Sequence, residues 1–191
     1  MNNNNHNNLN KDFKSAIVIV PPQDLLDQVQ AIRKQHDKSY ERWMPHINLI
    51  FPFVKIDQFE EKHEQLQSVL SYFSSFTLVF KEFSNFQHGK SSVIWLKPET
   101  PDQPNAINQL QRILETNLPG FDELSNKSEA GFCPHMTVGQ SAAGKQTTDK
   151  ITQFQTDFKP IEFQVKEIYL IHRDGEVPFT IRKTLKLGGS D

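Results

Sequence analysis

The chain has little cysteine, little net charge and no long apolar run, and each shortage excludes a class of protein. Its one cysteine, Cys133, cannot form a disulfide within the chain, and no segment reaches the roughly 18 consecutive apolar residues of a membrane span. With 21 Lys and Arg against 23 Asp and Glu, a formal charge of −2 produces no strong attraction to polymeric nucleic acid or to an anionic membrane. The N-terminus also lacks an apolar signal core. We therefore expect a reduced, soluble monomer in the cytoplasm or nucleus, which must bind any phosphate through local contacts.

The N-terminal segment differs from the rest of the chain in composition. Residues 1–10 are nearly all asparagine and offer too little apolar surface to offset the entropy of ordering. We expect residues 1–12 to be a disordered tail and residues 13–191 to form one bilobal domain. A chain of 191 residues suits one compact domain or two small lobes that share a cleft.

Apolar periodicity predicts a mixture of strands and helices. Short β-branched or alternating runs indicate strands, and apolar residues repeated at three- and four-residue spacing indicate helices. By residue number, the predicted order is strand 15–20, helix 25–32, strand 45–51, helix 57–73, hairpin 76–96, helix 105–118, strand 134–138, helix 151–158, strand 161–171 and strand 179–187. Each half of this order reads as a strand with histidine, a helix and a hairpin, which suggests an internal duplication.

Two short segments share one pattern of residues. Pro45–Leu49 reads Pro-His-Ile-Asn-Leu and Pro134–Val138 reads Pro-His-Met-Thr-Val. Because side chains alternate along a strand, each histidine points to the same side as the residue two positions later, which is Asn48 in one segment and Thr137 in the other. If the two halves face each other, two imidazoles and two hydrogen-bond donors converge on one cleft.

That set of groups suits the cleavage of a phosphodiester. One histidine can remove a proton from water or a 2′-hydroxyl while the other protonates the leaving oxygen, and a pKa near 6.5 permits either role. Thr137 and Asn48 would hold the phosphoryl oxygens. A single histidine in an apolar strand is more often a core residue, but packing gives no reason for the same polar pair in both strands, because each costs desolvation.

The paired motifs at His46 and His135, 135 − 46 = 89 residues apart, resemble those of the two-histidine (2H) phosphoesterase superfamily, and most closely its 2′-5′ RNA ligase-like branch. The resemblance implies an α+β fold, bilobal and pseudo-symmetric, with two antiparallel sheets forming a central cleft and helices outside. It also implies chemistry without a metal or cofactor on 2′,3′-cyclic phosphates, 2′-5′ linked nucleotides or RNA ends, with His46 and His135 as acid and base. Thr137 matches the family pattern, whereas Asn48 replaces its usual Thr or Ser.

Other residues carry weaker signals. Arg42 and Arg173 could bind a phosphate with a bidentate fork, although a solvated surface charge is the more usual role for such residues. Trp43 could stack on a base or pack against the cleft wall. His172 could complete a three-histidine zinc site, but no acidic ligand or close histidine pair supports one. Cys133 is expected to be a small buried packing residue.

Three functions remain open at this point. The first is an enzyme, a cyclic phosphodiesterase or RNA-end phosphoesterase. The second is a non-catalytic nucleotide- or RNA-binding module, which the replacement at Asn48 favours. The third is a 2′-5′ ligase, since a catalyst of cyclic-phosphate opening also catalyses the reverse step.

Overall fold

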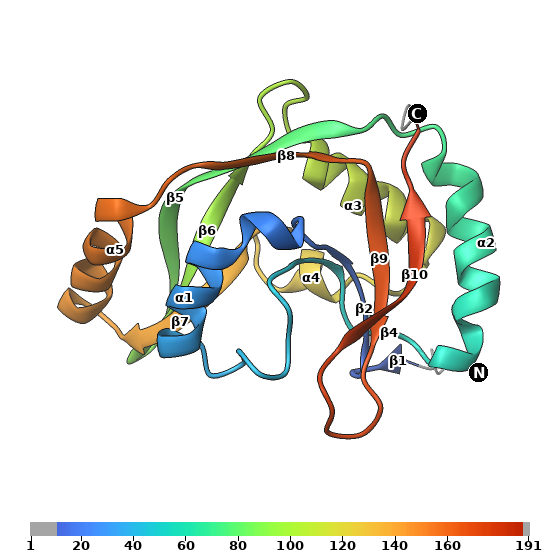
Figure 1. Cartoon of the computed structure of the whole chain (residues 1–191). Helices are drawn as coiled ribbons and strands as arrows, with labels where there is room; N and C mark the ends of the chain where they lie inside the picture. The colour runs from blue at the N-terminus through green and yellow to red at the C-terminus, as the bar shows by residue number, and fades with distance from the viewer. Residues whose placement is uncertain (1–10, 189–191) are drawn as a thin grey trace.

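The protein is described by a computed structural model that covers residues 11–188, and it combines helices with antiparallel sheets (Figure 1). Among these residues, no helix has both the length and the apolar character that crossing a bilayer requires. The helices are α1 (Asp27–His36), α2 (Phe59–Leu70), α3 (Ala106–Asn117), α4 (Glu123–Asn126) and α5 (Lys145–Asp157). The strands are β1 (Lys11–Asp12), β2 (Ser15–Ile19), β3 (Ile47–Ile50), β4 (Phe53–Val54), β5 (Phe76–His88), β6 (Ser91–Glu99), β7 (Met136–Ala142), β8 (Ile161–Val165), β9 (Glu167–His172) and β10 (Thr180–Lys186).

Two four-stranded antiparallel sheets form the frame of the molecule. The first has the order β10-β9-β2-β3 and the second the order β7-β6-β5-β8, while β1 and β4 form a separate small pair. α2 lies beside β10 at one margin of the molecule and α5 lies near β5 and β7 at the other (Figure 1). The predicted α+β architecture with two antiparallel sheets is confirmed. Each motif strand, β3 and β7, is the edge strand of its sheet.

The two halves of the sequence do not each form one lobe, as the repeated order suggested. The β5–β6 hairpin follows His46 in sequence but pairs with β7, and the β9–β10 hairpin follows His135 but pairs with β2. The helices are exchanged as well, because α1 packs on β7 and α3 packs on β3. A Cβ on Gly139 of β7 would lie 2.8 Å from the Cβ of His36, so α1 approaches this strand very closely. Local periodicity specifies a strand and its two faces but not its neighbours, which is why the exchange was not predicted.

The predicted continuous strand over 161–171 is wrong. The chain leaves the second sheet after Val165 and enters the first sheet at Glu167, so this run becomes β8 and β9. The change of sheet shifts the phase of burial, because Ile161 and Val165 are buried at odd positions and Ile168 and Leu170 at even ones. An alternation whose phase slips by one residue marks the break.

The predicted tail ends too late at residue 12, because Lys11 and Asp12 pair with Val54 and Phe53 as β1. The rest of the predicted tail, residues 1–10, lies outside the described residues. The ordered domain therefore includes these two residues as well.

Strand β2 of the first sheet is buried on both faces. Ile17 and Ile19 of β2 join the main core, which fills the space between sheets and helices, while Ala16 and Val18 join a smaller cluster on the opposite face. The smaller cluster also contains Phe179, with Trp43, Met44 and Phe51 packed against it. Burial of both faces explains why β2 is a continuous β-branched run without polar alternation. The smaller cluster lies directly behind the first motif histidine.

Candidate active site

The two motif histidines line one cleft of about 290 Å³, together with Asn48 and Thr137. His46 immediately precedes β3 and His135 immediately precedes β7, so each lies where an edge strand begins. The period-two alternation of the strands brings the residue two positions later onto the same wall. The predicted convergence of these four residues is confirmed.

Both imidazoles make the same hydrogen bond. The Nδ1 of His46 lies 2.7 Å from the carbonyl oxygen of Met44, and the Nδ1 of His135 lies 2.8 Å from that of Cys133. A carbonyl oxygen only accepts, so Nδ1 must carry the proton in each ring. Each ring therefore keeps its Nε2 for a substrate, as a base when neutral or as an acid when protonated.

The surroundings of His46 disfavour its charged form. The pKa of His46 is lowered to about 4, mainly by burial and also by the positive charges of Arg33 and of a protonated His135, while the hydrogen bond to the Met44 carbonyl and the charge of Asp37 act in the opposite direction. The influence of His135 shows that the two rings share one electrostatic environment. His46 is consequently neutral at physiological pH.

His135 has a different neighbourhood. Burial lowers its pKa, the hydrogen bond to the Cys133 carbonyl raises it, and the charge of Lys127 lowers it. Lys127 also lines the cleft. It lies in the polar connection between α4 and the second motif, and no pattern in the sequence marks it as a site residue. The positive charge of Lys127 can attract an anion into the cleft.

Trp43 lines the cleft, but both faces of its indole are covered. Its ring centroid lies 4.6 Å from that of His46, with 17° between the planes, and 3.8 Å from that of Phe179, with 24° between the planes. A base therefore finds no free face on Trp43. The side chain instead connects the smaller apolar cluster to His46 and holds the imidazole plane.

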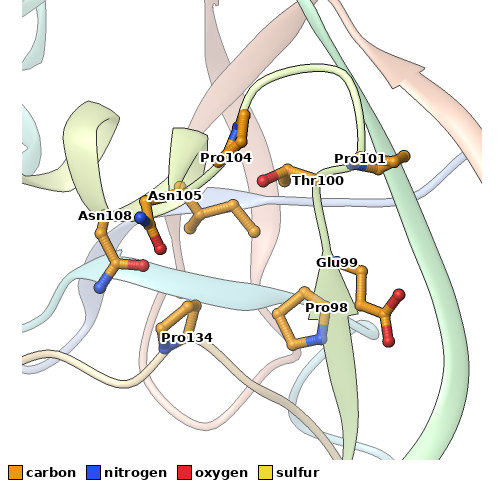
Figure 2. Close-up of a pocket in the computed structure, with 9 residues that line it drawn as sticks. Pro98, Glu99, Thr100, Pro101, Pro104, Asn105, Asn108 and Pro134 are labelled. Carbon is orange, nitrogen blue, oxygen red and sulfur yellow. The ribbon is translucent and has the colours of Figure 1, made fainter.

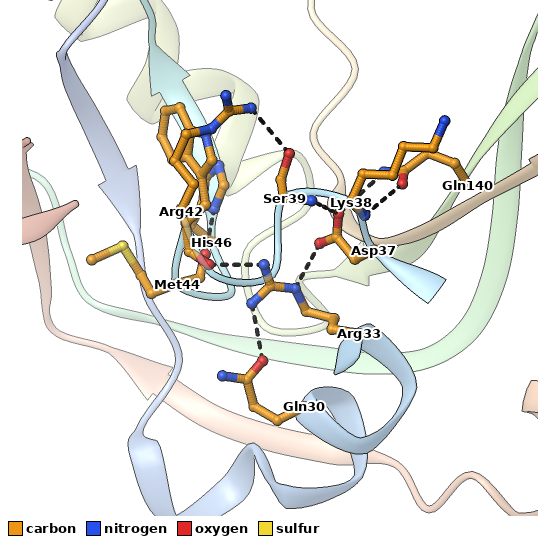
Figure 3. A network of polar contacts seen from close by, with 10 residues as sticks. Gln30, Arg33, Asp37, Lys38, Ser39, Arg42, Met44, His46 and Gln140 are labelled. Carbon is orange, nitrogen blue, oxygen red and sulfur yellow. Dashed lines mark hydrogen bonds and ion pairs between the residues drawn. The ribbon is translucent and has the colours of Figure 1, made fainter. Parts of the chain in front are cut away.

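A buried polar network, which sequence reasoning missed, borders His46 (Figure 3). Arg33 of α1 is 1% exposed; its Nε donates to Asp37 Oδ2 at 2.9 Å and its guanidinium also donates to the Trp43 carbonyl at 2.8 Å. Asp37 Oδ1 accepts from Gln140 Nε2 of β7 at 3.2 Å. The network thus ties α1, the segment before His46 and the second motif strand together. In sequence, an Arg and an Asp four residues apart look like an ordinary surface pair on a helix.

Asn48, the residue that departs from the common motif, has an unsatisfied acceptor. Its Oδ1 is buried and has no hydrogen-bond partner. Such an atom costs free energy unless a ligand donates to it.

The two arginines proposed from sequence are not among the residues that line the cleft. Arg42 is exposed and donates to Ser39 Oγ at 3.2 Å. Arg173 is 8% exposed, contacts the ring of Phe179 at 5.7 Å and donates to Glu176 at 3.1 Å. Arg173 therefore supports the stack behind Trp43.

The alternative zinc site is not assembled. His172 lies on β9 outside the cleft, 3.4 Å from Asp174 and 3.8 Å from Asp12. Over residues 11–188, His, Cys, Asp and Glu side chains form no group of three or more that could hold a metal ion. The prediction that Cys133 is buried is wrong, because it lies just before β7 and is exposed.

Two other hollows among the described residues have no histidine in their lining. One, of about 310 Å³, is lined by four prolines together with Ile107 and four polar or charged residues (Figure 2). The other, of about 830 Å³, lies between the end of α2 and the surface of α3 and is lined by amides, Tyr72 and Arg112. The second of these hollows is larger than the cleft that holds the two histidines, so size alone does not locate the acid–base groups.

Comparisons with known proteins agree with this geometry. The family model described as the 2′-5′ RNA ligase superfamily matches residues 21–177. A Geobacillus kaustophilus protein named "Putative phosphoesterase" is 28% identical over 94% of this chain and 99% of its own, and a Bacillus thuringiensis protein of the same name is 27% identical over 92% and 98%. Among solved structures, E. coli LigT with 3′-AMP has a TM-score of 0.56 at 20% identity, covering 91% of this chain and 97% of LigT. TT0787 of Thermus thermophilus has a TM-score of 0.57 at 14% identity, covering 92% and 98%.

Proposed function

This chain belongs to the 2′-5′ RNA ligase superfamily, and on that basis we propose that it is a phosphodiesterase acting on 2′,3′-cyclic phosphates or 2′-5′ linked nucleotides and RNA ends. The observation that carries the proposal is the meeting of two imidazoles in one cleft, each with Nδ1 held by a carbonyl and Nε2 left for chemistry. E. coli LigT, which shares the fold, has been solved with 3′-AMP, and this supports a nucleotide as ligand.

In the proposed reaction, His46 Nε2 takes a proton from water as the water oxygen forms a bond to phosphorus. The bond from phosphorus to the 2′ or 3′ oxygen breaks, and His135 Nε2 donates its proton to that oxygen, which leaves a phosphate monoester. His46 is assigned the role of base because its pKa of about 4 leaves Nε2 unprotonated at neutral pH. His135 becomes the acid when the phosphate lies beside it, since a nearby anion favours the charged imidazole.

The remaining cleft residues would hold the phosphoryl oxygens. Lys127 supplies a positive charge beside His135, and Thr137 and the amide of Asn48 supply neutral donors from the two motif strands. Donors that are already in place stabilise the charge that develops on these oxygens in the transition state. The proposed chemistry requires no metal or cofactor.

The test is to incubate the protein in excess EDTA with the four nucleoside 2′,3′-cyclic phosphates and a 2′-5′ linked dinucleotide, and to identify products by chromatography. Turnover should survive EDTA and fall by about 10²–10⁴-fold in each of His46→Ala and His135→Ala. His63→Gln is the matched control, because His63 lies on α2 and bonds the Thr184 carbonyl at 2.8 Å, away from the cleft. Equal turnover in all variants would contradict the two-histidine mechanism.

The unpartnered Oδ1 of Asn48 favours a second candidate, a nucleotide-binding module without turnover. In that case the wild-type protein binds a nucleotide by calorimetry and cleaves none of the substrates, and His46→Ala leaves the affinity largely unchanged. In ligation a 5′-hydroxyl replaces water as the attacking group on the cyclic phosphate: His46 takes its proton, the bond from phosphorus to the 3′ oxygen breaks with a proton from His135, and a 2′-5′ linkage forms. Product analysis at high RNA concentration detects it.

A further inference from the structure

The cleft has one apolar wall, and it belongs to the second sheet. The lining residues are mostly polar or charged; the apolar ones are Trp43, Phe86 and Val93. Trp43 is enclosed between His46 and Phe179. Phe86 and Val93 therefore provide the apolar surface that a ligand in the cleft can reach.

Phe86 is supported from beneath by a buried indole. Phe86 of β5 is opposite Val93 of β6, and Trp95 is opposite Ser84, so Phe86, Val93 and Trp95 lie on the same face of the sheet. The ring centroids of Phe86 and Trp95 are 4.7 Å apart with 31° between the planes. Trp95 is 7% exposed, whereas Phe86 stays partly exposed and lines the cleft. Trp95 thus fixes the ring that Phe86 presents.

This aromatic surface adjoins the acid–base site. The ring centroid of Phe86 lies 5.0 Å from that of His135, with the planes at 89°, and Trp95 lies 5.9 Å from His135. Lys127 lines the same cleft, and its charge, which acts on His135, can attract the phosphate of a substrate. The cleft therefore joins a phosphate-binding region to a flat apolar surface.

We propose that Phe86, supported by Trp95, is the platform on which the nucleobase of the substrate stacks, so that the cleft selects a nucleoside phosphate over a phosphodiester that has no base. The inference rests on the proposed function and specifies its substrate class. Bases stack on aromatic side chains regardless of sequence, because every base has a π face. The cleft volume of about 290 Å³ lies just below the ~300–1,000 Å³ typical of small-molecule sites, which suits one nucleotide and not a long strand.

The deciding experiment compares adenosine 2′,3′-cyclic phosphate with methyl riboside 2′,3′-cyclic phosphate, which lacks the base. The wild-type kcat/KM should favour the nucleoside by about 10- to 100-fold, in line with one stacked base. Phe86→Ala should remove this preference, mainly by raising KM for the nucleoside, so that the two substrates then react with similar kcat/KM. Phe86→Trp should preserve the preference. Tyr72→Ala, which removes a 90% exposed aromatic ring outside the cleft, is the matched control and should preserve it as well.

Phe86→Leu separates stacking from support of His135, because leucine keeps apolar contact with Trp95 and removes the π face. If Phe86→Leu lowers kcat for both substrates equally, Phe86 only positions His135 and the proposal is overturned. It is overturned too if wild type does not distinguish the two substrates.

If the protein turns over neither substrate, that result counts against the proposed function. A binding measurement then still tests whether Phe86 is the platform for the base. Calorimetry then compares 3′-AMP with methyl riboside 3-phosphate on wild type and Phe86→Ala. Tighter binding of 3′-AMP by about 10- to 100-fold, lost in Phe86→Ala, supports the platform without catalysis. Equal affinities in wild type, or equal losses for both ligands in the variant, would overturn it.

Discussion

The surroundings of His46 and His135 differ although the two rings make the same hydrogen bond. His46 is enclosed, with the indole of Trp43 on its face and the buried Arg33 nearby. His135 packs edge-to-face with the partly exposed ring of Phe86, feels the charge of Lys127 and follows the exposed Cys133 by two residues. A repeated motif thus reproduces backbone geometry, while the packing around it stacks one imidazole on Trp43 and leaves the other against the partly exposed ring of Phe86.

Removing either imidazole should have the largest effect on catalysis. If both histidines serve one proton-transfer step, then His46→Ala, His135→Ala and the double variant should all lose about 10²–10⁴-fold in kcat, since groups that act as a unit are strongly non-additive. Single-turnover rates on a cyclic nucleotide measure this. A double variant whose loss equals the product of the two single losses would show that the rings act independently.

Arg33 holds together the buried polar network that joins α1, the segment before His46 and β7. Arg33→Met leaves the Asp37 carboxylate without its buried partner, and we expect the free energy of unfolding to fall by about 3–5 kcal/mol, measured by denaturant titration. Lys145→Met removes an ion pair of the same i,i+4 spacing, with Asp149, that is exposed to solvent. Its effect should be small, and equal losses in the two variants would mean that burial of the Arg33 pair contributes nothing.

The pH dependence of stability tests whether the folded protein keeps the His46 ring neutral. The pKa of His46 is about 4 in the folded protein and about 6.5 when unfolded, so the folded state favours the neutral ring. This contribution is fully present above pH 6.5 and is lost as the pH falls toward 4, and it amounts to at most about 3 kcal/mol. His46→Leu should therefore lose less stability than wild type between pH 7 and pH 4 in denaturant titrations. An unchanged pH profile would show that His46 is not held neutral.

Asn48→Thr makes the first motif resemble the second and should have the smallest effect. It removes the buried, unpartnered Oδ1 and places a residue with high β-propensity on an edge strand, so the free energy of unfolding should rise by about 1 kcal/mol. Thr137→Asn is the reciprocal variant and should be destabilising. A loss of stability in Asn48→Thr would indicate that the amide makes a compensating contact.

Much of the candidate site could be predicted because it depends on local geometry. The positions of Asn48 and Thr137 relative to their histidines follow from the period of a strand. Residues whose surroundings come from distant segments were harder to interpret. Trp43 is covered by Phe179 from the far end of the chain, and Arg33 is buried by contacts that reach β7 through Asp37 and Gln140.

Sequence by itself determined that two strands each present a histidine and a hydrogen-bonding residue on one face, because alternation is a property of every extended chain. Only the tertiary structure decided that the hairpins and helices are exchanged between the sheets and which aromatic ring faces the cleft. The physical reason is that strand pairing and burial are contacts between residues far apart in sequence. Period-two alternation leaves the choice among such partners open.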